Sequence, residues 1–165
     1  MGGYKRRKGT SYNHIRLGKI LMFSFGTSSE RKLATVDPEL VEVPRLVMSW
    51  GVYDFTIVWG FRTDDEQMQA FLSGNSKKKT GSYHQVTKDG DPYAQAIDFA
   101  PWVNGGIPWK DTHAFAVLGG MMIAAGELLE IPIVYGGDWD MDGLTTDQTL
   151  MDWGHIQKKH PETSS

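Results

Sequence analysis

The chain has 165 residues, of which 40% are hydrophobic and 12% aromatic, so it can form one domain with a modest packed core. It contains no cysteine, which excludes disulfides and thiolate metal sites, so a metal ion would need histidine and carboxylate ligands. No stretch approaches the ~18–20 consecutive apolar residues that a membrane span requires.

Positive charge is concentrated at the start of the chain. Residues 1–21 carry a charge of +6 with no acidic side chain, whereas the rest of the chain carries -9. This asymmetry predicts a basic flexible extension, then a single domain over residues 22–160 and a polar tail over residues 161–165. We expect the extension to contact an anionic envelope surface, or else to be a non-native leader before Met22. It has no apolar segment typical of a secretory signal. We expect no nucleic-acid partner and a monomer.

The first predicted elements are a helix and a strand. Asp37 followed by Pro38 is typical of a helix start, with the aspartate as N-cap and the proline in the first turn. We expect this helix to extend to Trp50, with Pro44 kinking it or ending its first part. Residues 53–61 are rich in β-branched and aromatic side chains, which predicts a buried strand.

A second helix and strand follow. Thr63 and Glu66 form a T-x-x-E capping box, which predicts a short helix ending at Leu72. Residues 73–82 form a polar, basic loop. The sequence AIDFAPWV, at residues 96–103, predicts a second strand.

The last part of the chain adds one long helix and two strands. Asp111 is expected to cap a helix ending near Leu129, although Gly119 and Gly120 weaken its middle. Residues 131–137 predict a strand, and residues 138–148 an acidic loop. Residues 153–157 predict a short final strand. Because helices and strands do not alternate regularly, we predict an α+β fold, with a small antiparallel sheet and helices packed on one side.

Two histidines and two carboxylates form the most informative group in the sequence: His84, Asp98, Asp152 and His155. Two histidines and one carboxylate suit a catalytic zinc ion that keeps its fourth position for water, and a second carboxylate would supply the base. His84 and His155 each adjoin a predicted strand that has a carboxylate nearby. The other histidines lack this context and are given no role: His14, His113 and His160.

The order of motifs strengthens this interpretation. The pattern S-x-H, A-x-D and D-x-x-H, together with the segments GFRT, YGGDW and DWGH, resembles the zinc DD-carboxypeptidase and L-alanyl-D-glutamate peptidase (VanY-like) family, and above all its phage endolysins. The resemblance covers roughly residues 22–157. It implies that His84, Asp98 and His155 bind zinc on the sheet, and that Asp152 is the general base.

The same resemblance assigns two substrate-binding residues. Arg62 falls where the family has an arginine that binds substrate and stabilises the oxyanion. Ser82 falls where the family binds the substrate's carboxyl or backbone groups. The alternative for Arg62 is a surface ion pair with Asp64 or Asp65.

The sequence departs from the family pattern between the first two ligands. The family commonly has six residues there, whereas thirteen lie between His84 and Asp98, and Ala94 stands at the usual glycine position. The insertion adds Asp89 and Asp91 as alternative ligands. Asp98 is favoured because a strand would hold its carboxylate rigidly, whereas KDGD is typical of a turn.

A second group of acids has the spacing of a calcium loop. The pattern D-x-D-x-D-G of an EF-hand is formed by Asp138, Asp140, Asp142 and Gly143. Thr149 replaces the usual glutamate at the twelfth position, and Asp147 could supply a later ligand. The alternative is a solvated acidic turn. Calcium here would order the loop that precedes Asp152 and His155.

These features predict a phage endolysin, a zinc metallo-endopeptidase that hydrolyses the L-alanyl-D-glutamate bond of peptidoglycan stem peptides. We expect synthesis in the host cytoplasm and action at the periplasm or cell wall after release. One alternative is a D-alanyl-D-alanine carboxypeptidase. Another, from a different class, is a non-catalytic, calcium-bound module that binds the cell wall.

Overall fold

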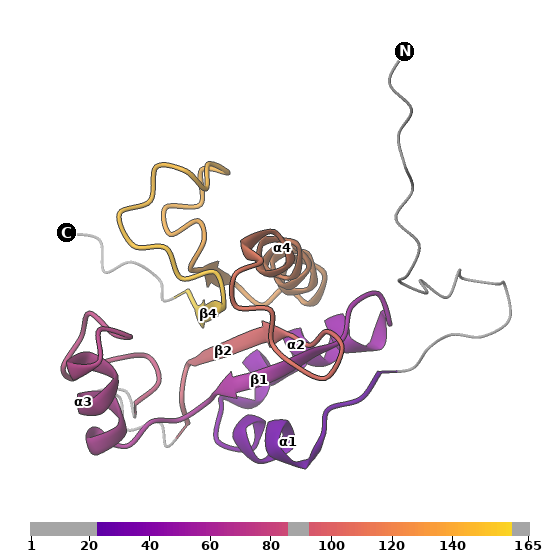
Figure 1. Cartoon of the computed structure of the whole chain (residues 1–165). Coiled ribbons are helices and arrows are strands. Elements are labelled where there is room, and N and C mark those ends of the chain that lie inside the picture. Colours follow the sequence, from indigo (N-terminus) through magenta and orange to yellow (C-terminus); the bar gives the residue numbers. More distant parts are fainter. Residues whose placement is uncertain (1–22, 86–92, 160–165) are drawn as a thin grey trace, which may run out of the picture.

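The computed structural model describes residues 23–85 and 93–159 (Figure 1). The basic extension, the polar tail, Asp89 and Asp91 lie outside the described residues. Eight elements follow one another in the described part: α1 (Thr27–Leu33), α2 (Pro38–Ser49), β1 (Phe55–Trp59), α3 (Asp64–Leu72), β2 (Ala96–Pro101), α4 (Thr112–Leu129), β3 (Ile133–Tyr135) and β4 (His155–Lys158).

The strands form one antiparallel sheet in the order β1-β2-β4-β3. The prediction of an α+β fold with a small antiparallel sheet is therefore confirmed. β2 and β4 are the two central strands, although more than fifty residues separate them along the chain. Asp98 on β2 lies directly opposite His155 on β4.

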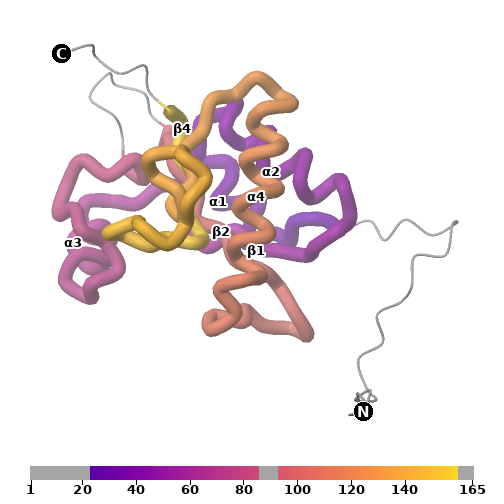
Figure 2. The backbone as a smooth tube through the Cα atoms, turned by 90° about the horizontal axis from the view of Figure 1, so that it is seen from above, coloured from indigo at the N-terminus to yellow at the C-terminus, as the bar shows by residue number. Residues whose placement is uncertain are grey.

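The hydrophobic core lies between one face of this sheet and three helices. Phe99 of β2 and Ile156 of β4 are buried there, together with Leu118 and Met122 of α4. α2 packs along α4, and α1 packs against β1. Figures 1 and 2 show α3 to one side of this arrangement. Successive strand residues point to opposite faces, so Asp98 faces away from the core.

The three predicted helix caps are present. Asp37 accepts hydrogen bonds from the Glu39 and Leu40 amides. Thr63 and Glu66 form the complete capping box of α3, and the Asp111 side chain accepts from the Ala114 amide of α4. These are local contacts within one helical turn, which is why the sequence alone could predict them.

Other boundaries differ from the predictions. α2 continues through Pro44 to Ser49, so the proline does not end the helix. α1 was not predicted, and its N-cap Gly26 offers no side-chain signal. β1 and β3 are shorter than expected, at five and three residues.

α4 corrects the expectation that no stretch approaches a membrane span. It has 18 residues and a mean hydropathy of 1.4, so by length and composition alone it could cross a membrane. One face of the helix is buried against α2 and the sheet, through residues such as Leu118, Met122 and Ala125. α4 therefore contributes this face to the core of the domain, whereas apolar side chains elsewhere on the helix remain exposed, among them Val117, Ile123 and Leu128.

The two adjacent glycines of α4 have different surroundings. A Cβ at Gly119 would collide with the Tyr135 ring, whereas a Cβ at Gly120 would meet nothing within 4 Å. We expect Gly119→Ala to lower the free energy of unfolding by about 1–3 kcal/mol through overpacking. The matched control Gly120→Ala should raise it by about 0.5–1 kcal/mol, since alanine favours helix. Urea unfolding would measure both, and equal effects at the two positions would contradict this packing.

Candidate metal centre

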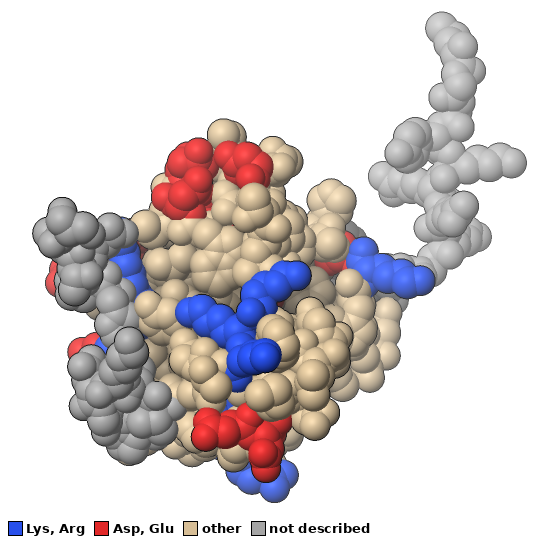
Figure 3. All heavy atoms as spheres, turned by 90° about the vertical axis from the view of Figure 1, so that its left-hand side faces the viewer, with Lys and Arg blue, Asp and Glu red and all other residues tan. Residues whose placement is uncertain are grey.

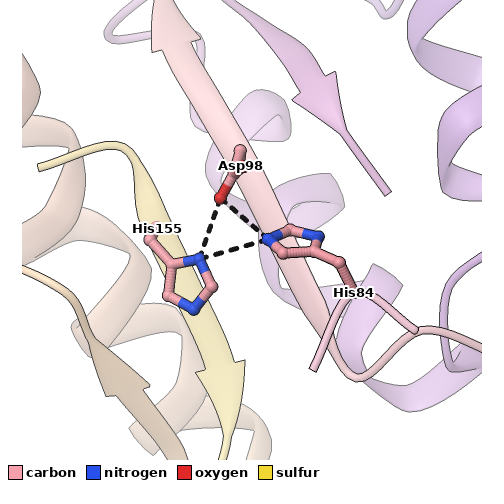
Figure 4. Close-up of side chains that lie close together, drawn as sticks. All are labelled: His84, Asp98 and His155. Atoms are coloured by element: carbon pink, nitrogen blue, oxygen red, sulfur yellow. Dashed lines mark hydrogen bonds and ion pairs between the residues drawn. The ribbon is translucent and has the colours of Figure 1, made fainter. Parts of the chain in front are cut away.

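Three side chains from separate parts of the chain converge on one point (Figure 4). The Nδ1 atom of His155 lies 2.8 Å from Oδ1 of Asp98, and Nε2 of His84 lies 3.1 Å from the same oxygen. The two histidine nitrogens are 3.3 Å apart. His84 and His155 are 2% and 6% exposed. The structure therefore brings together the three residues that the resemblance assigns to zinc.

The sheet register places two of the three. The Phe99 amide donates to the Gly154 carbonyl and the Lys158 amide to the Gln95 carbonyl, on either side of the Asp98–His155 pair. Asp98 and His155 therefore form a non-hydrogen-bonded pair, the type in which facing side chains are closest.

His84 reaches the centre from the segment before β2. Its carbonyl accepts a hydrogen bond of 2.7 Å from the Arg62 amide, and the Gln95 amide donates over 2.7 Å to the neighbouring Tyr83 carbonyl. The segment is thus joined to the chain beyond β1 and to the start of β2. These backbone hydrogen bonds fix the position of the His84 backbone relative to β2 and to the chain that follows β1.

Each histidine has an acceptor at its other ring nitrogen. Nδ1 of His84 lies 2.7 Å from the Gly60 carbonyl oxygen, and Nε2 of His155 lies 3.1 Å from Oε1 of Gln157. Each acceptor takes the ring N–H, so the nitrogen that faces the centre carries a lone pair. Such outer partners are typical of metal-binding histidines, whose tautomer and ring orientation they fix.

The spacing of the three donor atoms also fits a metal. In a tetrahedral site with bonds of ~2.0–2.1 Å, neighbouring ligand atoms are about 3.3 Å apart. The observed separations of 2.8, 3.1 and 3.3 Å are close to this value. The His84–Asp98–His155 group can therefore hold a metal ion.

The charge state of the group shows what competes with a metal. Burial would raise the pKa of Asp98, but the charges and hydrogen bonds of His84 and His155 hold it well below its ordinary value. Burial would lower the pKa of His155, but its contacts with Asp98 raise it. A proton and a metal ion therefore compete for the same nitrogen, and metal binding should weaken at acidic pH.

Arg62 is a buried partner of the centre. It is 7% exposed, and its Nη2 donates to Oδ2 of Asp98. Its guanidinium carbon lies 5.2 Å from the centre of the Trp59 ring. Among the described residues its ion pair is with Asp98, not with Asp64 or Asp65. Arg62 thereby orients the Asp98 carboxylate from the side opposite the histidines.

Asp152 lies in a tight turn beside the centre. The His155 amide donates to the Asp152 carbonyl over 3.1 Å, and the Asp152 amide donates to Gly136 over 2.9 Å. A side chain at Gly136 would collide with the Asp152 backbone, so a glycine is required there. Burial, and then the negative charge of Asp98, raise the pKa of the Asp152 carboxyl group. A raised pKa is typical of carboxyl groups that transfer protons.

The centre opens into a cleft with two lobes. The larger lobe has a volume of about 510 Å³ and is lined by several aromatic side chains, among them Trp109, Phe115 and Trp153. The smaller lobe has a volume of about 140 Å³. Arg62, Asp98 and Asp152 line both lobes, so the centre lies where they meet. An extended chain bound across both lobes would pass the centre.

Ser82 lines the smaller lobe near His84. Its hydroxyl oxygen accepts a hydrogen bond of 3.3 Å from the His84 amide. The Gln85 amide donates to the Ser82 carbonyl over 2.9 Å, so the residues form a turn. Ser82 thus helps to shape the segment that carries His84, and its side chain also borders the cleft.

The acidic loop brings three of its four candidate ligands together. Asp138, Asp140 and Asp142 each offer one oxygen within a common span of 4.8 Å. The Asp138 carboxylate also accepts from the Asp142 and Gly143 amides. Asp147 is outside this group and shares the Gln148 amide with Asp140. Backbone hydrogen bonds to Asp138 also fit the alternative of an acidic turn.

Sequence reasoning missed the two outer partners of the histidines. Gln157 follows His155 by two residues on a strand, so alternation places both side chains on one face, and this signal was available. The Gly60 carbonyl contact has no sequence signal, since any residue has a carbonyl group. His113 is exposed, while His14 and His160 lie outside the described residues.

The site and fold together define a class of small α+β protein with a His–Asp–His group that can hold a metal ion in an open cleft. The family described as phage L-alanyl-D-glutamate peptidase matches residues 21–158. The L-alanyl-D-glutamate peptidase of Escherichia phage T5 is 39% identical over 142 residues, covering 83% of this chain and 98% of that protein. The chain therefore belongs to the phage L-alanyl-D-glutamate peptidase family.

A solved structure extends the likeness to the fold. The L-Ala D-Glu endopeptidase ChiX of Serratia marcescens superposes with a TM-score of 0.66 at 25% identity. The match covers 87% of this chain and 96% of ChiX. The arrangement of helices around the small sheet is thus shared across most of both chains.

Removal of one histidine from the group should abolish tight metal binding. We expect His155→Ala to weaken the binding of a divalent metal by more than about 100-fold, because loss of an outer partner alone costs ~10–100-fold. The exposed His113→Ala is the matched control and should bind metal as the unaltered chain does. Metal titration followed by calorimetry would measure both. Equal affinities for the two variants would exclude this centre.

Proposed function

We propose that this protein is a zinc metallo-endopeptidase that hydrolyses the L-alanyl-D-glutamate bond of peptidoglycan stem peptides, and that it acts as a phage endolysin. The observation that carries the proposal is the His84–Asp98–His155 group, which can hold a metal ion and lies beside Asp152 in an open cleft. The ring nitrogen of each histidine that faces away from this group already has a hydrogen-bond acceptor, at Gly60 or Gln157. Family membership supports the same reaction. Zinc ligands would be His84, Asp98 and His155.

Zinc is the metal that best suits these donors. Two imidazole nitrogens and one carboxylate oxygen form a three-ligand set that is typical of catalytic zinc, while calcium and magnesium prefer oxygen alone. When bound, zinc would lower the pKa of a coordinated water from ~15.7 towards ~7. The group fits this metal in both donor type and spacing.

Asp152 and Arg62 would carry out the remaining steps. The Asp152 carboxylate would accept the proton of the attacking water and deliver it to the leaving amine of D-glutamate, as a general base and then a general acid. Burial raises the pKa of the Asp152 carboxyl group, which favours the protonated form that the second step needs. Arg62 would donate to the carbonyl oxygen as negative charge develops there, a contribution typically worth ~10²–10³ in rate. Ser82 would bind a carboxyl or backbone group of the substrate.

The proposal includes where the protein meets its substrate. Peptidoglycan stem peptides would be the partner, and the basic residues 1–21 would contact an anionic envelope surface. Synthesis would take place in the host cytoplasm, followed by release to the cell wall.

Digestion of purified peptidoglycan tests the function directly. Zinc-loaded protein should produce new N-terminal D-glutamate residues, detected by mass analysis of the fragments. We expect Asp152→Asn to lower the rate by about 10²–10⁴-fold while folding and bound zinc are retained, because it removes the proton acceptor. A matched control is Asp111→Asn, which alters an exposed carboxylate at the start of α4.

Other products would point to the alternatives. Release of D-alanine would identify a D-alanyl-D-alanine carboxypeptidase. Absence of cleavage by zinc-loaded protein, combined with binding to the wall, would identify a non-catalytic module.

We also propose that the acidic loop binds calcium through Asp138, Asp140 and Asp142, with Asp147 as a later ligand. The three grouped carboxylates support this site. The loop leads directly to the turn of Asp152 and His155, so calcium would stabilise the active arrangement of that turn. Oxygen ligands on alternate residues before a glycine suit Ca²⁺.

Calcium dependence can be separated from zinc dependence. With zinc retained, removal of calcium should reduce cleavage, and the double variant Asp140→Asn with Asp142→Asn should no longer respond to calcium. Asp65→Asn, an exposed carboxylate on α3, is the control and should respond normally. Equal activity of the unaltered protein with and without a calcium-selective chelator would reject a regulatory role for the loop.

A further inference from the structure

The two lobes of the cleft differ in charge. Beyond the centre itself, the charged side chains that line only the smaller lobe are Lys77 and Lys78, within the described part of the chain. The larger lobe is instead rich in aromatic side chains, including Trp109 and Phe115, whose rings stack. Figure 3 shows basic side chains gathered in the middle of the α3 side of the molecule, between two acidic groups. The cleft thus has a cationic end and an aromatic end.

The cationic end is held in place by a buried contact. Gln67 of α3 is fully buried, and its Nε2 donates to the Ser76 hydroxyl over 2.8 Å and to the Lys78 carbonyl over 2.6 Å. The Ser76 amide donates to the Ala70 carbonyl over 3.0 Å. The loop that carries the two lysines is therefore fixed to α3 at its backbone.

The Lys78 side chain lies over a residue next to the candidate metal ligand His84. Its Nζ lies 5.4 Å from the centre of the Tyr83 ring, and Tyr83 directly precedes His84. The ammonium group is thus held over the segment that supplies a ligand. Both lysines are exposed, so they remain accessible to a bound substrate.

The substrate of the proposed reaction is charged on one side only. The bond joins the carbonyl of L-alanine to the amine of D-glutamate. Glutamate has two carboxyl groups, and the stem peptide continues through one of them. The other is free, so a carboxylate lies on the D-glutamate side close to the bond that is cleaved. The alanyl residue has no free carboxylate, because its own carboxyl group forms the bond.

Resting on the proposed function, we infer that Lys77 and Lys78 form the subsite for this free carboxylate. The D-glutamate side of the substrate then occupies the smaller lobe, and the L-alanyl side occupies the larger, aromatic lobe. The lysines thereby fix the direction in which the peptide crosses the centre. They also make the enzyme prefer stem peptides whose D-glutamate carries a carboxylate over those in which it is amidated.

The chain contains its own control for this inference. Lys79 follows Lys78 and is exposed, but it lines neither lobe. Its Nζ lies over the Phe71 ring instead, 5.4 Å from the ring centre. Lys79→Gln changes the net charge of the protein as much as Lys77→Gln or Lys78→Gln does, without altering the cleft.

The test compares two synthetic stem peptides that differ only at D-glutamate, one with the free carboxylate and one with the carboxamide. KM and kcat would be measured for the zinc-loaded protein, for Lys79→Gln and for the double variant Lys77→Gln with Lys78→Gln. We expect the unaltered protein to have the lower KM for the carboxylate peptide. The double variant should raise that KM by about three- to tenfold, as expected for partly exposed charge pairs. Its ratio of the two KM values should approach one.

The outcomes separate this inference from the function on which it rests. Cleavage of both peptides with an unchanged KM ratio in the double variant would overturn the lysine subsite and leave the peptidase function standing. Lys79→Gln removes one charge and the double variant removes two, so a net-charge effect would give Lys79→Gln about half the double variant's change in log KM, and this outcome would also overturn the subsite. Absence of cleavage of either peptide by the unaltered protein would overturn both. Higher salt should reduce the preference in the unaltered protein, because exposed charges are screened.

Discussion

The convergence of three lone-pair donors on one point is the constraint on which the rest of this structure depends. His84, Asp98 and His155 bring their donor atoms within 3.3 Å of one another, in a largely buried place. Without a cation or a proton between them such donors repel, and burial strengthens the repulsion because the local dielectric is low. The fold therefore has to hold them together. The β2–β4 register does this for two of them, since a shift by one residue would turn Asp98 towards the core.

The outer contacts of the group each serve one donor. Gly60 accepts a hydrogen bond from the His84 ring and Gln157 accepts one from the His155 ring. Arg62 donates to the second carboxylate oxygen of Asp98. Asp98 therefore has donating partners on both of its oxygens, and the charges and hydrogen bonds of His84 and His155 hold its pKa low despite burial. At Asp152, burial and the negative charge of Asp98 outweigh the same positive neighbours, and the pKa of its carboxyl group is raised. The surroundings of the two carboxyl groups thus shift their pKa values in opposite directions, although both line the same cleft.

Much of this could be predicted from local sequence. The helix caps at Asp37, Thr63 and Asp111 follow from contacts within one turn, and the α+β class follows from the order of elements. The partner of Arg62 could not be predicted, because its ion pair joins residues thirty-six positions apart in the chain. The same holds for Gly119, whose lack of a side chain makes room for Tyr135 of β3. Such requirements appear only when packing is known.

The long connection between His84 and Asp98 shows why a candidate metal site can tolerate a change in chain length. Both ends of the connection are fixed by hydrogen bonds: Gln85 donates from its side chain to Asp64, and the Ala94 amide donates to the Thr35 carbonyl. Lengthening this connection from the family's usual six residues to thirteen is about one doubling, and a doubling of loop length costs only ~0.6 kcal/mol of closure entropy. The positions of the donors are therefore set by the strands and by these anchors, and the length of chain between them is free to vary.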